Sequence, residues 1–401
     1  MNNPSAHSPQ ADPILKVRHL RQYFPIKGSR DSVHAVDDLN FDVQRGEILG
    51  LVGESGCGKT TTGRSIIKLY EATGGYIEFN GNPIFNGKKG RRKVLRDRAF
   101  QTQKAKKRLA TVRDELILAR PQDKVAIEQK YNQQIAQEDQ DLAKFTEGYN
   151  AFVDSCPEAN PTPEQMARMQ MIFQDPISSL NPRMTVREII AEGMIIQGEK
   201  DEKLISERVN QALERVGLVR SHANRYPHEF SGGQRQRVGI ARAVVMQPDM
   251  IIADEPVSAL DVSVQAQVLN LLNELSEELS LSIIFIAHNL SVVKYFSDRI
   301  AVMYFGKMVE LCSSDELFHC PLHPYTKSLL SAIPYPDPVY EKTRKRINYN
   351  PQLEHDYLFD KPELREIVPG HFVYCNQAEA QAHEAEAQAK SLFFHPLAEA
   401  E

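Results

Sequence analysis

The sequence predicts an α/β fold with a parallel sheet at its centre. Apolar runs of strand length alternate with helical stretches along the chain, and this order is typical of parallel sheets. One such run, residues 48–52, leads through a glycine-rich loop into a helical stretch at residues 60–69. Two later runs, residues 250–253 and 282–287, each follow a helix of their own. We therefore expect these three strands in the core of the sheet.

The composition is that of an ordinary globular protein. Hydrophobic residues make up 41% of the 401 residues and charged residues 25%, which allows one large domain with appendages or two modest domains. The net charge of −5 gives no indication of a nucleic-acid partner. The five cysteines lack short paired spacings, which argues against a disulfide framework or a zinc ribbon and favours a reducing cytoplasm.

No segment has the character of a signal peptide or of a membrane span. Residues 1–13 are polar and lack the apolar core of a signal peptide. No apolar run reaches the roughly 18 residues that a membrane-spanning helix needs. We therefore expect a chain that does not cross a membrane, although it could dock on a protein that does.

The first part of the chain predicts mostly strands. Runs that suit strands occur at residues 14–20, 33–36 and 39–43, before the core strand at residues 48–52. A further strand, residues 76–79, follows a pair of glycines after the first helix.

Residues 88–165 differ in character from the rest of the chain. Two stretches, residues 94–119 and 125–152, are rich in Lys, Glu, Gln, Ala and Arg. Pro121 lies between them and breaks the helix, so we expect an antiparallel helical hairpin.

The two arms of this hairpin carry opposite charge. Between residues 88 and 113 there are twelve Lys and Arg but a single acid, Asp97. The second arm carries acids that could pair with the first: Glu128, Glu138, Asp139, Asp141 and Glu147. Two interpretations stay open, a solvated charged hairpin and a docking surface for a partner or an acidic lipid.

The elements after the hairpin alternate between strands and helices again. We predict a strand at residues 169–173 and helices at residues 186–197, 202–216, 240–246 and 264–278, around the core strands already named. Residues 300–304 and 307–311 predict a final β-hairpin that turns at Phe305 and Gly306. Beyond residue 318 the chain is proline-rich, and its Ala/Glu/Gln-rich stretch at residues 377–390 is expected to be helical or disordered.

The loop after the first core strand has the pattern of a phosphate-binding loop, G-x-x-x-x-G-K-[ST], with a strand before it and a helix after it. Its glycines let consecutive N–H groups point inward, and the helix presents its positive N-terminal end to the phosphates. Lys59 would reach the β- and γ-phosphates, and the Thr60 hydroxyl would bind Mg²⁺. The predicted nucleotide-binding residues here are Gly53, Glu54, Ser55, Gly56, Cys57, Gly58, Lys59, Thr60 and Thr61.

An acidic pair, Asp254 and Glu255, follows the core strand at residues 250–253. Ligands of open α/β sheets bind at this end of the strands. Asp254 can hold Mg²⁺ through water, and Glu255 is placed to polarise the attacking water as a general base. His288 ends the next strand and could contact the γ-phosphate, although a lone histidine at such a position is more often structural.

A second phosphate site is predicted at Ser231, Gly232, Gly233 and Gln234, just before a helix. A serine cap with two glycines leaves bare N–H groups at a helix start. One nucleotide cannot contact both this site and the phosphate loop unless the chain folds back or a second copy supplies one of them.

The order of these motifs resembles that of ABC-type ATPases. Residues 231–234 resemble the signature of that family and lie shortly before the acidic strand, Walker B, as in the family. Gln174 matches the glutamine of the Q-loop, residues 258–261 match the D-loop, and His288 matches the switch histidine. Phe24, beside Tyr23, lies where family members stack an aromatic ring on adenine.

A narrower resemblance points to the ATPases of oligopeptide and dipeptide importers. Residues 175–182 are similar to the Q-loop region of that subfamily, and residues 323–330 resemble its tail signature. Residues 370–375 resemble the end of the same C-terminal extension, and residues 35–38 fit the second of the two paired ATPases of such importers.

The resemblance covers residues 14–335 apart from the hairpin and implies an ABC-type P-loop NTPase core with an antiparallel β subdomain and a helical subdomain. The inserted helical hairpin and a C-terminal extension are additions to that core. The expected division of the chain is a polar tail at 1–13, a cassette at 14–318 with the hairpin at 88–165 and the helical and signature region at 169–246, an extension at 319–376, and a tail at 377–401.

The resemblance also implies a head-to-tail dimer of cassettes with two ATP molecules between them. The catalytic residues would be Glu255, His288 and Lys59. Thr60, Gln174 and Asp254 would hold Mg²⁺, and residues 231–234 would serve the ATP of the partner. Because Glu255 is retained, we expect ATP hydrolysis and not binding alone.

The expected partners are a second ABC ATPase, in a heterodimer or a homodimer, two transmembrane permeases and an extracytoplasmic peptide-binding protein. The expected location is the cytoplasmic face of the cell membrane, with no nucleic acid bound. Peptides are the default solute, and nickel chelates, heme and sugars are alternatives. Some relatives hold an iron–sulfur cluster in the tail, but only Cys375 stands at such a position here, so no cluster is expected.

A soluble ABC ATPase of translation or DNA repair is the rival class. A translation factor of this type would carry two cassettes, and only one phosphate loop is visible. A repair ATPase with an inserted hairpin has far longer arms and a zinc hook, whereas arms of about 25 residues span only about 40 Å.

Overall fold

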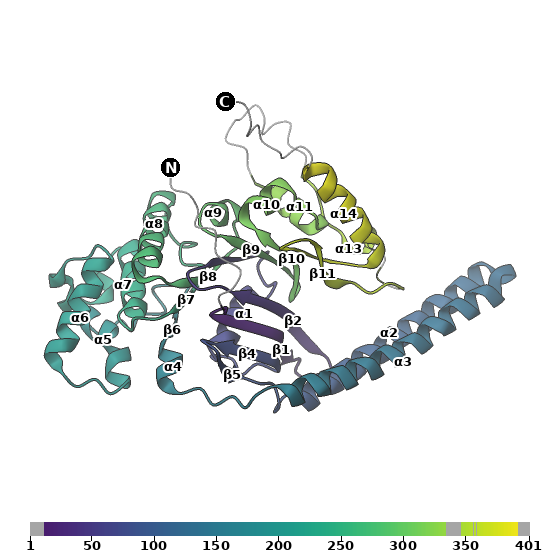
Figure 1. The fold of residues 1–401 in the computed structure, drawn as a ribbon, viewed down its shortest axis with the longest axis horizontal. Helices are drawn as coiled ribbons and strands as arrows, with labels where there is room; N and C mark the ends of the chain where they lie inside the picture. Colours follow the sequence, from purple (N-terminus) through teal and green to yellow (C-terminus); the bar gives the residue numbers. More distant parts are fainter. Residues whose placement is uncertain (1–11, 334–345, 356, 358, 392–401) are drawn as a thin grey trace, which may run out of the picture.

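The computed structural model describes residues 12–333, 346–355, 357 and 359–391 of the chain (Figure 1). Its larger sheet consists of β3 (Ile48–Val52), β6 (Met169–Ile172), β7 (Met250–Asp254), β8 (Ser282–Ala287), β9 (Arg299–Tyr304), β10 (Lys307–Ser313), β11 (Glu363–Val368) and β12 (His371–Cys375). The strand order is β11-β12-β10-β9-β3-β8-β7-β6. The five strands from β9 to β6 are parallel to one another, and the other three add antiparallel. The predicted parallel core is confirmed.

The smaller sheet is antiparallel, in the order β2-β1-β4-β5. Its strands are β1 (Leu15–Pro25), β2 (Ser32–Val43), β4 (Gly74–Phe79) and β5 (Asn82–Phe85). The sequence predicted two strands where β2 is one. Asp38 has a φ of 69° at a break in the β1–β2 register, so a bulge interrupts the apolar alternation without ending the strand.

The parallel strands of the larger sheet are buried on both faces, which explains the unbroken apolar runs of β3, β7 and β8. Successive side chains of a strand point to opposite faces. Accordingly, Ile252 and Ile284 pack towards the smaller sheet and α1 (Lys59–Ile66). Ile251 and Phe285 pack instead into the core on the opposite face of the sheet. That face is covered by α8 (Val262–Leu279), α9 (Leu290–Lys294) and α10 (Ser314–His319).

A group of helices lies beside β6 and β7, at the left of Figure 1. It consists of α5 (Val186–Ile196), α6 (Glu202–Arg215) and α7 (Gly232–Val244). The sequence placed the start of the last helix at residue 240, which is wrong. Ser231 caps the helix through its side chain, so α7 begins at Gly232 and the two signature glycines form its first turn.

The predicted helical hairpin is confirmed as α2 (Arg91–Ala119) and α3 (Lys124–Ser155), and α4 (Pro163–Ala167) leads from it back to β6. Figure 1 shows the hairpin extending well away from the two sheets. Only some of the acids predicted to pair with the basic arm do so. Asp139 contacts Lys106 of the first arm, but Glu138 and Asp141 both contact Lys361 of the C-terminal extension.

The C-terminal extension is part of the main sheet. β12 pairs with β10, and β11 forms the outer edge. The described residues of this region contain the helices α11 (Pro324–Ser331), α13 (Pro351–Glu354) and α14 (Gln377–Ser391). Of the two alternatives for residues 377–390, the structure therefore has the helix, and its Ala380 and Ala387 pack with Leu322.

Parts of the expected division lie outside the described residues, namely residues 1–11 of the polar tail, residues 334–345 of the extension and residues 392–401 of the C-terminal tail. Within the described residues, no helix combines the length and the apolar character needed to cross a membrane.

Candidate nucleotide site

The phosphate loop joins β3 to α1, and three of its glycines have backbone conformations that favour glycine. Gly53, Gly56 and Gly58 have φ values of 151°, 83° and 109°. A Cβ on Gly58 would lie 2.1 Å from the carbonyl oxygen of Ala35, and a Cβ on Gly53 would lie 2.2 Å from that of Met303. Both the conformation and the close approach of the neighbouring backbone therefore require glycine at these positions.

Lys59 is buried and its ammonium group spans the loop. Its Nζ donates to the carbonyl oxygens of Gly53, at 2.7 Å, and Glu54, at 2.9 Å. The Cys57 thiol lies 3.8 Å from the same nitrogen. Burial raises the pKa of this thiol, which favours its neutral form.

Thr60 and Asp254 form the part of the site that suits a metal ion. The Thr60 hydroxyl donates to Oδ1 of Asp254 at 2.7 Å. Asp254 is fully buried, and burial raises its pKa against the opposing effects of Thr60 and Arg64. Its Oδ2 has no hydrogen-bond partner among the described residues, and the Arg64 guanidinium is 4.0 Å away. A free carboxylate oxygen beside a hydroxyl is the oxygen chemistry that Mg²⁺ prefers, so these residues fit that ion.

Three polar side chains meet at the ends of neighbouring parallel strands. Oε2 of Glu255, after β7, accepts a hydrogen bond from Nε2 of Gln174, after β6, at 3.0 Å. The same oxygen lies 3.1 Å from Nδ1 of His288, after β8. The carboxyl ends of parallel strands lie at one edge, so the sheet itself brings these groups together.

Glu255 is held in a strained backbone conformation. Its φ is 45°, which costs on the order of 1–3 kcal/mol for a residue other than glycine. This conformation is stabilised by a 3.0 Å hydrogen bond from the Glu255 N–H to the carbonyl oxygen of Ile286. Such strain is typical of functional positions, where the chain aims a side chain that regular geometry would turn elsewhere.

The signature lies on α7, apart from the phosphate loop. The Ser231 hydroxyl accepts from the N–H of Gln234 at 3.3 Å, and the Gln234 side chain accepts from the N–H of Ser231 at 3.0 Å. Gly232 is exposed, and a Cβ on Gly233 would lie 2.5 Å from Cγ1 of Val264. Across the described part of the chain, no hydrogen bond or ion pair joins the signature to the phosphate loop.

The predicted adenine contact, Phe24, lies at the end of β1. Its ring meets that of Tyr70 edge-on at 5.6 Å. Tyr23 beside it is buried, stacks on His34 at 4.0 Å and donates to Asp37. Of the two aromatic residues, Phe24 is the one whose ring is partly open to solvent, and its stacking on adenine stays a prediction.

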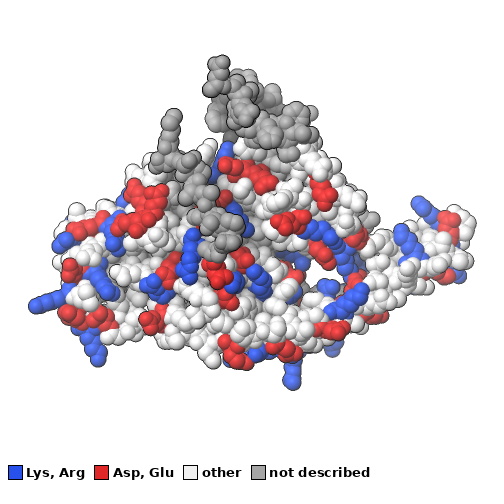
Figure 2. Space-filling model, viewed as in Figure 1, with Lys and Arg blue, Asp and Glu red and all other residues white. Residues whose placement is uncertain are grey.

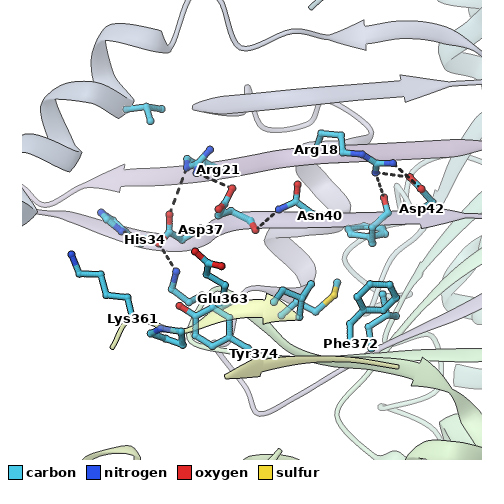
Figure 3. A pocket seen from close by; sticks show the side chains of 18 of the residues that line it. Arg18, Arg21, His34, Asp37, Asn40, Asp42, Lys361, Glu363, Phe372 and Tyr374 are labelled. Atoms are coloured by element: carbon cyan, nitrogen blue, oxygen red, sulfur yellow. Dashed lines mark hydrogen bonds and ion pairs between the residues drawn. The ribbon is translucent and has the colours of Figure 1, made fainter. Parts of the chain in front are cut away.

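A cavity of the described structure lies elsewhere. It has a volume of about 1490 Å³ and is formed between β1 and β2, the base of the hairpin, and β11 and β12. Figure 3 shows Arg21 and Asp37 on one side of it and Lys361 and Tyr374 on the other. None of the predicted nucleotide-binding residues is among those that line it.

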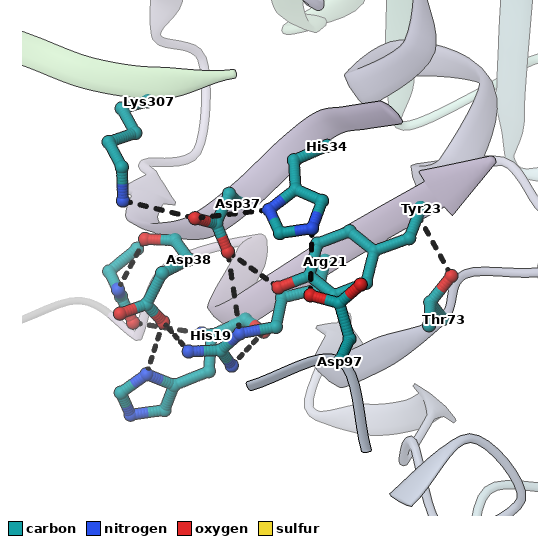
Figure 4. A network of polar contacts seen from close by, with 10 residues as sticks. His19, Arg21, Tyr23, His34, Asp37, Asp38, Thr73, Asp97 and Lys307 are labelled. Carbon is teal, nitrogen blue, oxygen red and sulfur yellow. Dashed lines mark hydrogen bonds and ion pairs between the residues drawn. The ribbon is translucent and has the colours of Figure 1, made fainter. Parts of the chain in front are cut away.

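A buried polar network fixes the base of the hairpin beside this cavity (Figure 4). Asp37 contacts Lys307 at 3.1 Å, and His34 lies 2.8 Å from Asp97 of α2. Burial by itself raises the pKa of Asp37, but contacts with His34, Lys307 and Tyr23 lower it well below its usual value. Asp97, the single acid of the basic arm, therefore anchors that arm to β2.

Sequence reasoning missed two residues near the site. Arg64, on α1, lies close to Asp254 and also donates to the Tyr70 hydroxyl at 3.1 Å. The hydroxyl of Tyr325, from the C-terminal extension, accepts from the N–H of Glu54 in the phosphate loop at 3.1 Å. Tyr325 lay within the recognised tail signature, but nothing in the sequence indicates which part of the fold its side chain contacts.

The sequence matches two family models. The model described as "ABC transporter" matches residues 36–155 and 134–258. The model "Oligopeptide/dipeptide transporter, C-terminal region" matches residues 309–357.

Curated relatives cover almost the whole chain. The oligopeptide transport ATP-binding protein OppF of Bacillus subtilis is 50% identical over 370 residues, which cover 92% of this chain and 98% of the relative. AmiF of Streptococcus pneumoniae, an oligopeptide transport ATP-binding protein, is 44% identical, with 92% and 97% covered. The dipeptide transport ATP-binding protein DppF of Lactococcus lactis is 40% identical, with 93% and 97% covered.

Solved structures share the fold. CbiO1 from Clostridium perfringens, part of the ABC transporter complex cbiONQ, superposes with a TM-score of 0.51 at 24% identity, covering 77% of this chain and 91% of its own. A dimeric post-hydrolysis state of the ATP-binding cassette MJ0796, bound to ADP and Pi, superposes with a TM-score of 0.50 at 21% identity, covering 75% and 98%. At this identity the likeness concerns the fold alone.

Proposed function

Because the chain belongs to the ABC transporter ATP-binding proteins of the oligopeptide/dipeptide type, we propose that it binds and hydrolyses ATP to drive the import of oligopeptides or dipeptides. The family supports the transport role, since a relative named for oligopeptide transport is 50% identical over nearly the whole chain. The observation that supports hydrolysis is the contact of the Glu255 carboxylate with Gln174 and His288.

ATP binds at the end of β3 in this proposal. The N–H groups of residues 53–61 surround the phosphates at the positive end of α1, and Lys59 neutralises the β- and γ-phosphates. Phe24 stacks on the adenine. Thr60, Asp254 and Gln174 hold Mg²⁺, which supplies positive charge at the phosphate oxygens.

Hydrolysis depends on Glu255. Its carboxylate accepts the proton of the water that attacks the γ-phosphate. His288 and Gln174 already contact one oxygen of this carboxylate, so they orient the base, and His288 contacts the γ-phosphate once ATP is bound.

Each active site is completed by a partner cassette. The signature offers the N–H groups of a capped helix start, yet it lies apart from the phosphate loop of its own chain. A head-to-tail dimer places Ser231, Gly232, Gly233 and Gln234 on the γ-phosphate of the partner's ATP. The described cassette fold is also that of a solved dimeric cassette.

The proposed assembly contains a second ABC ATPase and two transmembrane permeases, with an extracytoplasmic peptide-binding protein in the same system. The chain then lies at the cytoplasmic face of the membrane, where the loop after Gln174 contacts the permeases. The match to a transporter family and the relatives named for peptide transport argue against the rival class, a soluble ATPase of translation or repair.

Replacement of Glu255 by Gln tests this proposal. In the assembled transporter we expect steady-state phosphate release to fall by about 10²- to 10⁴-fold, the usual contribution of a general base. ATP should still bind and be trapped in a closed dimer. Cells that carry only this variant should lose uptake of a labelled oligopeptide but keep uptake of a free amino acid.

Two results would contradict the proposal separately. Near-normal phosphate release by the Glu255→Gln variant would refute the role of Glu255 as the base. Normal peptide uptake despite lost hydrolysis would refute the proposed role of this chain in driving that uptake.

A further inference from the structure

One peptide group of the phosphate loop is held from both sides. The N–H of Glu54 donates to the Tyr325 hydroxyl at 3.1 Å. This N–H shares its peptide group with the carbonyl oxygen of Gly53, which accepts from Nζ of Lys59 at 2.7 Å. Because a peptide group is planar, the direction of its N–H fixes the direction of its carbonyl. The hydroxyl of Tyr325 therefore orients the oxygen on which the Lys59 ammonium is anchored.

Tyr325 itself is held rigidly. It is only 2% exposed, and its ring packs against Tyr304 at 4.4 Å and Tyr349 at 5.5 Å. Burial raises the pKa of its hydroxyl, so the group stays neutral and able to accept the N–H of Glu54. Its backbone N–H donates to Nδ1 of His323 at 3.1 Å, which caps α11.

The contacts behind Tyr325 lead into the main sheet. The carboxylate of Glu310, fully buried on β10, accepts from the N–H groups of Leu322 at 2.8 Å and His323 at 3.1 Å. His371 of β12 lies 2.8 Å from the same carboxylate. The segment that carries Tyr325 is thus fixed to strands of both the cassette and the extension.

We propose that Tyr325 is a positioning residue for the nucleotide site, through which the C-terminal extension sets the affinity for ATP. It acts on Lys59 through the Gly53–Glu54 peptide group and does not touch the nucleotide. The proposal rests on the nucleotide site of the proposed function. A cassette without the extension would lack the hydrogen bond from Glu54 to Tyr325. The extension therefore has a role in ATP binding, in addition to adding strands to the main sheet.

The test replaces Tyr325 by Phe, which keeps the ring and removes only the hydroxyl. In the full-length chain we expect the dissociation constant for ATP to rise about two- to tenfold, the range expected for one neutral hydrogen bond. In the assembled transporter the KM for ATP should rise, while kcat at saturating ATP stays near the wild-type value. The reason is that Tyr325 stabilises the bound ATP and the transition state equally. Thermal unfolding reports whether the fold is intact.

Tyr304→Phe is the matched control. It removes a hydroxyl from the same aromatic cluster but not the contact to the loop, so ATP affinity should stay at the wild-type value. An equal loss of affinity in both variants would overturn the proposal, because packing of the cluster would then be the cause.

A double-mutant cycle with Lys59→Ala tests the route of the effect. If Tyr325 acts through Lys59, Tyr325→Phe should weaken ATP binding much less in the Lys59→Ala background than alone. Independent, multiplicative losses would overturn the proposal. Loss of affinity in Lys59→Ala with none in Tyr325→Phe would overturn it and leave the proposed function standing, whereas wild-type affinity in Lys59→Ala would overturn both.

Discussion

Two buried histidines of the C-terminal extension have opposite protonation states. Burial lowers the pKa of His323 to about 3, so its Nδ1 is free to accept the N–H of Tyr325. Burial by itself lowers the pKa of His371 as well. Polar contacts with Cys312, Glu310 and Glu316 outweigh this effect and raise the pKa to about 12. His323 is therefore neutral as the cap of α11, while His371 is the cation that balances the Glu310 carboxylate.

The low pKa of His323 makes stability depend on pH. An unfolded histidine has a pKa of about 6.5 and takes up a proton as the pH falls below that value. The folded chain does not take up this proton until the pH approaches 3. The contribution of His323 to stability is therefore fully present above about pH 6.5 and is lost progressively as the pH falls towards 3.

Replacement of His323 by Asn should remove this acid sensitivity. Asparagine also caps helices, but it does not titrate. Between about pH 6.5 and 4 the wild type should lose up to about 1.4 kcal/mol per pH unit relative to the variant. Thermal unfolding across this range measures the difference. The exposed His228→Asn serves as control, and parallel pH profiles for wild type and His323→Asn would contradict the assignment.

At the scale of elements, ion pairs join the hairpin both to the smaller sheet and to the segment before β11. Asp97 of α2 contacts His34 of β2, and Glu138 and Asp141 of α3 contact Lys361 just before β11. Figure 2 shows basic and acidic side chains interspersed on the visible face of the hairpin, without a surface of one sign. On this face, the mixed charge favours the solvated hairpin over a docking surface for acidic lipid.

Replacement of Lys361 by Met should loosen the hairpin. Glu138 is 6% exposed, and a buried carboxylate without its cation costs about 1–3 kcal/mol. We expect faster amide hydrogen exchange in the middle of α3 and near-normal ATP binding. Lys106→Met is the matched control, because its exposed pair with Asp139 should contribute at most about 1 kcal/mol. Equal exchange rates in the two variants would refute the anchoring role of Lys361.

Local patterns predicted most helices and strands of the cassette, but not the strands of the extension. The hairpin helices follow from long helix-forming stretches around Pro121, and the core strands from apolar runs buried on both faces. β11 has exposed and half-buried positions, so its apolar signal is weak, and β12 is only five residues long. β12 is a strand because it pairs with the edge of β10, and β11 in turn pairs with β12.

At the scale of the whole molecule, no hydrogen bond or ion pair of the described residues joins the signature to the phosphate loop, and the proposed dimer accounts for this separation. This can be tested by combining variants in one dimer. Ser231→Ala in this chain, together with loss of the phosphate-loop lysine in the partner, leaves one composite site intact. Ser231→Ala together with Lys59→Ala in the same chain leaves none.

Single-turnover hydrolysis should therefore persist in the first combination and fall to about 10²-fold below it in the second, the usual effect of removing a phosphate-stabilising donor. The reverse order of activities would show that the signature serves the nucleotide of its own chain.

The sequence by itself determined the groups that carry the proposed chemistry. The phosphate loop, the acidic pair and the capped signature are local patterns, and each depends on the backbone geometry of a few adjacent residues. Only the tertiary structure decided which of these groups meet. Glu255 contacts Gln174 and His288 because β6, β7 and β8 are neighbours in the sheet. Tyr325 contacts Glu54 although the two residues are 271 positions apart in the sequence. Such contacts are set by the packing of whole elements and not by the order of residues.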